Sequence, residues 1–198
     1  MNKRTVFLKK VSGEVFRNGA RECTGRSRGA RIRETLERIL KEEPVTLVVL
    51  DFSGSGPVDF SWADEVVAKI VSRLCSNEYG ERYLVLRGLT ASQTENIEVA
   101  LERKKLAVLT TGPGGWRIIG SLNNYLAHTL NQVMNKKRLT LKELSEAERI
   151  GMNTSGTRLL NLYKKRLVFR VENAAGVNKD VPHRGRQYVY QSLLSQVS

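Results

Sequence analysis

An almost unbroken apolar segment, residues 45–50, directly follows Pro44 and limits the possible folds more than any other part of the chain. A strand with one solvated face alternates apolar and polar residues, and this segment does not. It therefore predicts a buried, central strand of a sheet. The glycine- and serine-rich residues 53–57 end this strand as a turn.

The neighbouring segments alternate between helical and extended patterns. Residues 4–17 alternate loosely around Ser12-Gly13 and predict a β-hairpin, and residues 18–29 predict a loop. Apolar residues at helical spacing predict three helices: one over residues 30–41, one that begins after an N-cap at Ser61 and one that begins after an N-cap at Ser92. Apolar runs predict strands at residues 82–89, 106–109 and 116–119. This order predicts an α/β domain, a sheet with packed helices, over residues 1–120.

After Ser121 the pattern changes to three helices followed by two strands. The helices are expected from residue 122, from Thr140, which forms a capping box with Glu143, and over residues 153–166. Residues 167–171 and 186–190 alternate and predict a hairpin with a long, basic connection. Three helices and a hairpin in one domain, residues 121–198, are the layout of a winged helix-turn-helix, an α+β fold.

The charge of the chain favours a polyanionic partner. The formal net charge is +13, and residues 121–198 carry 13 Lys and Arg against 5 Asp and Glu, or +8. A field of this sign attracts nucleic acid. The alternative is a generally basic, solvated surface.

The third helix of the second domain carries a polar stripe that fits a DNA groove. Its hydroxyls, amide and cations include no acid, and such groups contact base edges and phosphates. Basic residues of the hairpin connection, with His183 among them, would lie along phosphates. The predicted DNA contacts are Thr154, Ser155, Thr157, Arg158, Asn161, Lys165, Lys179, Arg184 and Arg186.

Residues 139–144, 153–159, 167–168 and 185–190 together resemble a bacterial or archaeal winged-helix transcriptional regulator. The resemblance covers about residues 122–193. It implies double-stranded DNA as the partner and regulation of transcription as the function. A homodimer is a further expectation.

Residues 50–54 and 59–65 resemble the STAS-like family, relatives of sulfate-transporter and anti-sigma-factor-antagonist domains. The resemblance implies a small mixed sheet with packed helices and a protein partner for the first domain. In the antagonists a serine at the start of the helix after this strand is phosphorylated. Aligning Asp59 places Phe60 at that position and Ser61 one residue later, so we predict Ser61 as an N-cap, with phosphorylation as the alternative.

Two further groups of residues are of types that form sites. Arg26, Arg28 and Arg31 lie in or near a glycine-bracketed basic segment that predicts an anion site or a second DNA contact, with a solvated loop as the alternative. Cys23 and Cys75 have no metal-ligand spacing and are expected to be reduced thiols. The sequence contains no nucleophile elbow, HExxH motif or phosphate loop. We therefore expect no catalytic activity, no metal and no cofactor.

The resulting hypothesis is a cytoplasmic DNA-binding regulator with a sensing or interaction domain and no membrane segment. One alternative is a protein-interaction module that works by partner switching without binding DNA. A second alternative is an enzyme whose pocket is assembled from distant residues of the first domain.

Overall fold

The computed structural model describes residues 2–16, 23–42, 44–172 and 187–196. The chain divides into two compact units, Met1–Leu122 and Asn123–Ser198, and the sequence placed the boundary two residues earlier. Each unit is described by itself. No helix in the described part of the chain is both long and apolar enough to cross a bilayer.

The first unit is built on a five-stranded mixed sheet in the order β1-β2-β3-β4-β5. The first four strands are parallel, and β5 pairs antiparallel with β4. The strands are β1 (Asn2–Phe7), β2 (Val45–Asp51), β3 (Tyr83–Arg87), β4 (Ala107–Gly112) and β5 (Gly115–Gly120). The predicted α/β class with a small mixed sheet is confirmed, and residues 45–50 form the core of a central strand.

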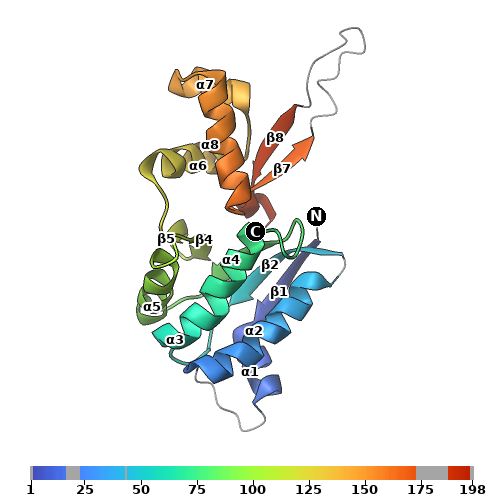
Figure 1. Cartoon of the computed structure of the whole chain (residues 1–198), viewed down its shortest axis with the longest axis vertical. Coiled ribbons are helices and arrows are strands. Elements are labelled where there is room, and N and C mark those ends of the chain that lie inside the picture. Colours follow the sequence, from blue (N-terminus) through green and yellow to red (C-terminus); the bar gives the residue numbers. More distant parts are fainter. Residues whose placement is uncertain (1, 17–22, 43, 173–186, 197–198) are drawn as a thin grey trace. The chain divides into compact units, whose positions relative to one another are not determined.

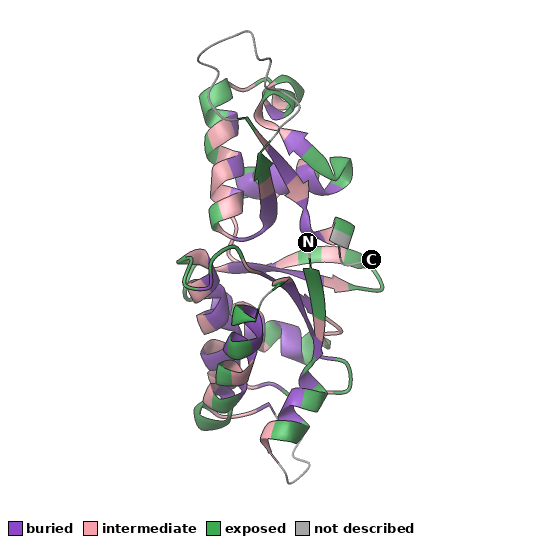
Figure 2. Ribbon diagram, turned by 90° about the vertical axis from the view of Figure 1, so that its right-hand side faces the viewer, coloured by how far each residue is buried: buried purple, intermediate pink, exposed green. Residues whose placement is uncertain are grey.

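The helices of the first unit lie along one face of this sheet (Figures 1 and 2). The parallel strands are added in sequence order, so right-handed crossovers bring every connecting helix to the same side. These helices are α1 (Leu8–Val15), α2 (Arg26–Lys41), α3 (Phe60–Ala63), a π-helical turn η1 (Asp64–Ala68), α4 (Lys69–Cys75) and α5 (Ala91–Glu102). One buried cluster joins helix and strand side chains, among them Ile32, Leu36, Val48, Leu50, Val66, Ile70, Leu86 and Ile97.

The local predictions for residues 4–29 and for the start of α5 are wrong. Residues 8–15 form helix α1 and not the second half of a hairpin, because Leu8, Val11 and Ser12 make a buried face at helical spacing that outweighs the cost of about 1 kcal/mol for Gly13 inside a helix. The loop expected over residues 18–29 already ends at Arg26, where α2 begins. The N-cap of α5 is Thr90 and not Ser92, and Thr90 forms a capping box with Gln93.

The second unit contains a three-stranded antiparallel sheet in the order β6-β8-β7, with three helices. Its elements are α6 (Asn124–Lys136), β6 (Arg138–Thr140), α7 (Leu141–Glu148), α8 (Met152–Lys164), β7 (Val168–Glu172), β8 (Tyr188–Ser192) and a 3-10 turn η3 (Leu193–Gln196). The capping box of Thr140 with Glu143 at the start of α7 is confirmed. The sequence did not predict β6, a strand of three residues.

Candidate nucleic-acid interface

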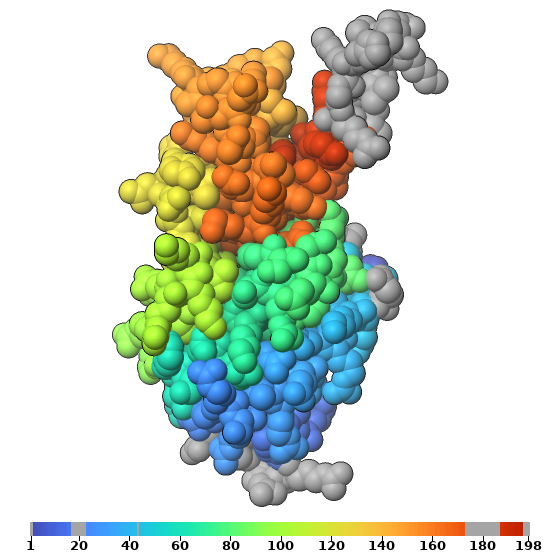
Figure 3. Space-filling view, in the orientation of Figure 1, coloured from blue at the N-terminus to red at the C-terminus, as the bar shows by residue number. Residues whose placement is uncertain are grey.

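Helix α8 is held in the second unit by its apolar stripe, and its opposite face reaches the surface. Leu159 and Leu162 are fully buried, and α8 packs against α6 and α7. On the outer face Asn153, Thr157 and Lys164 are exposed. They follow one another at intervals of four and seven residues, which places them on one side of the helix. The orange side chains of α8 form part of the surface in Figure 3.

The outer face of α8 is turned relative to the predicted stripe. Thr154 and Thr157 are exposed as expected for groups that contact DNA, whereas Arg158, Asn161 and Lys165 are only half-exposed. Ser155 is fully buried, so its prediction as a DNA contact is wrong. On the helical wheel Ser155 lies between Leu159 and Leu162, and this position in the sequence pattern indicates that it is buried.

The prediction missed Lys164, which lies at the centre of the outer face. Its spacing from Asn153 and Thr157 is the signal that identifies it. The hydroxyl of Thr157 donates to the carbonyl oxygen of Asn153 at 2.9 Å and retains its lone pairs for a further donor.

Arg158 forms an ion pair inside the second unit. Its guanidinium Nη1 lies 2.7 Å from Oε2 of Glu148, and the two side chains are 21% and 8% exposed. The guanidinium also lies over the ring of Tyr125, 5.4 Å from the ring centre. The predicted stripe was free of acids because only α8 was considered, and Glu148 comes from the end of α7. Arg158 is therefore positioned by its neighbours and is not a free cation.

A groove of about 390 Å³ runs beside α8. It is lined by Tyr125, Asn153, Thr154, Thr157, Arg158 and Asn161. The lining offers amides, hydroxyls and a guanidinium, which are groups that bind phosphate oxygens and the edges of bases. Tyr125 comes from the first turn of α6, and nothing in the sequence pattern indicated that it lies beside α8.

The β7–β8 hairpin is fixed to α8 by stacked arginine and tyrosine side chains. The guanidinium of Arg170 lies 4.2 Å from the ring centre of Tyr163 and 4.3 Å from that of Tyr188. Cation–π contacts of this kind contribute about 0.5–1 kcal/mol each at exposed sites. The predicted phosphate contacts Lys179, Arg184 and Arg186 lie outside the described residues, as does His183.

The basic residues predicted as a second anion site have intramolecular contacts in the first unit. Arg26 lies 3.2 Å from a carboxylate oxygen of Asp64 and 3.3 Å from one of Glu65. Arg31 donates to the carbonyl oxygen of Val15, and the guanidinium groups of Arg28 and Arg31 lie over the ring of Phe16. The site stays a prediction, and two carboxylates already compensate Arg26.

Glu65 is the centre of an ion-pair network in the first unit. The carboxylate is buried and forms ion pairs with Arg33 and Lys69 in addition to Arg26. Burial alone would raise the pKa of Glu65, but its contacts with Lys69 and Arg33 hold that pKa below the ordinary value. The carboxylate therefore stays ionised and links α2 to the helix that follows β2.

Ser61 is not an N-cap. The N-cap of α3 is Asp59, two residues earlier, and its carboxylate accepts from the amide of Trp62 at 2.7 Å. The other Asp59 oxygen accepts from the amide of Gly25 at 2.8 Å, so Asp59 also holds the segment before α2. Ser61 is half-buried inside the first turn, and its phosphorylation stays an untested alternative.

Among the described residues, no three His, Cys, Asp or Glu side chains are grouped so that they could hold a metal ion. Burial raises the pKa of Cys23 to about 11, so its thiol stays protonated near neutral pH. Neither a family model, nor a curated protein, nor a solved structure matches the chain.

Proposed function

We propose that the second unit binds double-stranded DNA and that the protein is a DNA-binding regulator. The observation that carries the proposal is the outer face of α8, which exposes Asn153, Thr157 and Lys164 on a helix that contains no acidic residue. Polar helix faces of this kind suit a major groove because they supply donors and acceptors to base edges together with positive charge.

The topology of the second unit supports this proposal. Its order is helix, strand, helix, helix, strand, strand, and the first strand joins the same sheet as the final hairpin. We infer a winged helix from this order, with α8 in the place of the recognition helix and the β7–β8 pair in that of the wing. The turn from α7 to α8 carries Arg149, which is exposed and lies close to the N-terminus of α8.

Two kinds of contact would hold the protein on DNA, contacts to base edges and contacts to phosphates. Asn153, Thr157 and Asn161 offer amides and hydroxyls that discriminate between base edges, Asn being the usual partner of adenine. Lys164 and Arg149 offer charge to phosphates, which positions the protein without reading sequence. The net charge of +8 over residues 121–198 adds attraction that depends on salt.

Replacing Lys164 by glutamine separates these two kinds of contact. The variant is expected to bind every duplex less tightly by a similar factor, and the slope of log affinity against log salt should fall by about one unit. Asn153→Ala should instead change the ranking of different sequences. Fluorescence anisotropy with a small panel of labelled duplexes measures both effects.

The matched control is Lys105→Gln, which removes the same charge from an exposed position of the first unit. It should leave the affinity and the salt slope close to those of the parent protein. An equal loss of affinity in Lys164→Gln and Lys105→Gln would mean that α8 is not the contact surface.

A second candidate function is protein interaction without DNA binding. Two exposed apolar side chains favour it, because Met152 is 48% and Tyr125 is 46% exposed and both belong to the helices that form the groove. The STAS-like resemblance of the first unit, which stays a proposal, also fits a protein partner. Capture of a protein through Met152 and Tyr125, with no DNA binding, would favour this second function.

A further inference from the structure

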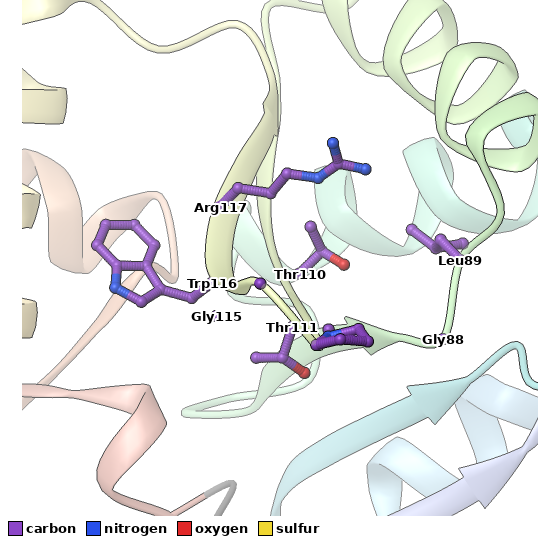
Figure 4. Close-up of a pocket in the computed structure, with 10 residues that line it drawn as sticks. Gly88, Leu89, Thr110, Thr111, Gly115, Trp116 and Arg117 are labelled. Atoms are coloured by element: carbon purple, nitrogen blue, oxygen red, sulfur yellow. The ribbon is translucent and has the colours of Figure 1, made fainter.

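A pocket of about 290 Å³ lies in the first unit at the carboxyl ends of β3 and β4 (Figure 4). One wall is the turn from β3 to α5, with Gly88 and Leu89, and the other is the β4–β5 hairpin, residues 110–117. Ligands of open α/β sheets bind preferentially outside the carboxyl ends of the strands.

The turn at Gly88 gives this end of the sheet its shape. Gly88 has a left-handed backbone, with φ +70°, and a Cβ there would collide with the hydroxyl of Ser53 and lie 3.0 Å from Oδ1 of Asp51. The close approach of these two turns therefore requires glycine. Next to this turn, the space between Leu89 and the β4–β5 hairpin forms the pocket.

Arg117 brings an uncompensated positive charge to the pocket. Its guanidinium donates to the neutral hydroxyl of Thr94 at 3.0 Å, and within the described ranges no carboxylate pairs with it. Arg87, at the same end of the sheet, differs because its Nη2 lies 2.6 Å from Oδ2 of Asp51. Burial alone would raise the pKa of Asp51, but its contacts with Ser53 and Arg87 hold that pKa below its ordinary value. Asp51 therefore stays ionised and compensates the charge of Arg87, whereas the charge of Arg117 is not compensated in this way.

Thr110 adds a hydroxyl to the wall of the pocket, opposite Arg117 in the β4–β5 pair. The residue is 4% exposed, and it lines the pocket. In Figure 4 Thr110 and Arg117, which are paired across β4 and β5, lie on one side of the hairpin, and the ring of Trp116 points to the other side. The hydroxyl of Thr110 is therefore placed to form a hydrogen bond with a group that Arg117 binds.

We propose that this pocket binds a small molecule that carries a carboxylate or a phosphate group. The anion would lie between the guanidinium of Arg117 and the hydroxyl of Thr110, and a compact apolar body would pack against Leu89 and Pro113. The volume is at the lower end of the range for ligand pockets, so it fits a small metabolite and not a nucleotide. This site belongs to the first unit and is independent of DNA binding by the second.

Titration of the full-length protein with benzoate and, separately, with inorganic phosphate tests the proposal. The readout is the backbone amide shifts in a ¹⁵N-labelled sample at constant ionic strength, with benzamide as the uncharged analogue of benzoate. At least one of the two anions should cause saturable shifts at Gly88, Leu89 and residues 110–112 and 114–117, and benzamide should not. The anion that binds more tightly identifies the carboxylate or the phosphate as the preferred group.

Arg117→Gln and Thr110→Val are the decisive variants. Arg117→Gln should weaken binding on the order of tenfold or more, since a charge-assisted hydrogen bond is lost, and Thr110→Val should weaken it less. Arg38→Gln, which removes an exposed arginine of α2, should have no effect. The proposal is overturned if neither anion shifts the pocket amides, or if the shifts persist unchanged in Arg117→Gln.

Discussion

Replacing Arg158 by alanine is expected to destabilise the second unit by about 3 kcal/mol, because removing one partner of a buried ion pair leaves an uncompensated charge. The remaining charge would be that of Glu148, whose side chain is 8% exposed. Its other oxygen, Oε1, has no hydrogen-bond partner among the described residues and lies 3.5 Å from Nε2 of His128. Hydrogen exchange of the α8 amides in the full-length protein measures the loss.

A double-mutant cycle separates the ion pair from the loss of packing. Glu148→Ala combined with Arg158→Ala should cost clearly less than the sum of the single changes, since no buried charge remains. Lys142→Ala is the control, because its contact with Glu146 is 3.9 Å long and exposed, and such a pair contributes about 0.5 kcal/mol or less. If Arg158→Ala is as mild as Lys142→Ala, the ion pair does not stabilise the unit.

This cycle also decides how DNA-binding results on Arg158 are interpreted. A variant that loses DNA binding because α8 has become unstable carries no information on base contacts. The double variant lacks the guanidinium and leaves no uncompensated buried charge. Its DNA affinity, compared with that of Glu148→Ala, isolates any direct contact of Arg158 with DNA.

Gly120→Ala is expected to destabilise the first unit by about 3 kcal/mol or more. Gly120 has φ +92°, and a Cβ there would collide with the carbonyl oxygen of Leu106 and lie 2.8 Å from Cβ of Leu101. Forced contacts with backbone cost about 1–3 kcal/mol, and the left-handed conformation adds about 1–2 kcal/mol for a residue with a Cβ. Urea denaturation followed by tryptophan fluorescence reports on this unit alone, because both tryptophans, Trp62 and Trp116, belong to it.

Gly112→Ala is the matched control at the other end of the same hairpin. Its backbone is not left-handed, and a Cβ there has no atom within 4 Å. The change in stability should stay within about 1 kcal/mol. Equal stability of the Gly112→Ala and Gly120→Ala variants would contradict the close packing of β5 against the segment before β4.

The sequence was most informative where one local pattern had a single physical solution. Residues 45–50 had no polar face to expose, so a buried strand followed directly. The capping box of Thr140 with Glu143 fixed the start of α7 because both partners lie within one turn. The buried stripe of α8 could be derived from spacing in the same way.

The sequence was least informative where contacts join distant segments. The alternation that suggested a hairpin at residues 4–17 is equally compatible with the spacing of Leu8, Val11 and Ser12 on a helix, and packing against α2 decides between them. The pair of Glu148 with Arg158 and the pocket at Arg117 depend on neighbours from other elements. No periodicity within one segment contains that information.

The central claim is tested most directly by fluorescence anisotropy of the full-length protein with a labelled mixed-sequence duplex over a salt series. Binding through α8 and the basic surface of the second unit predicts saturable binding at micromolar or lower concentrations at about 50 mM salt, with log affinity falling linearly with log salt concentration. A chain with a net charge of +13 has its best chance of binding DNA under these conditions. No saturable binding at about 50 mM salt would contradict the account and would leave protein interaction as the function of the second unit.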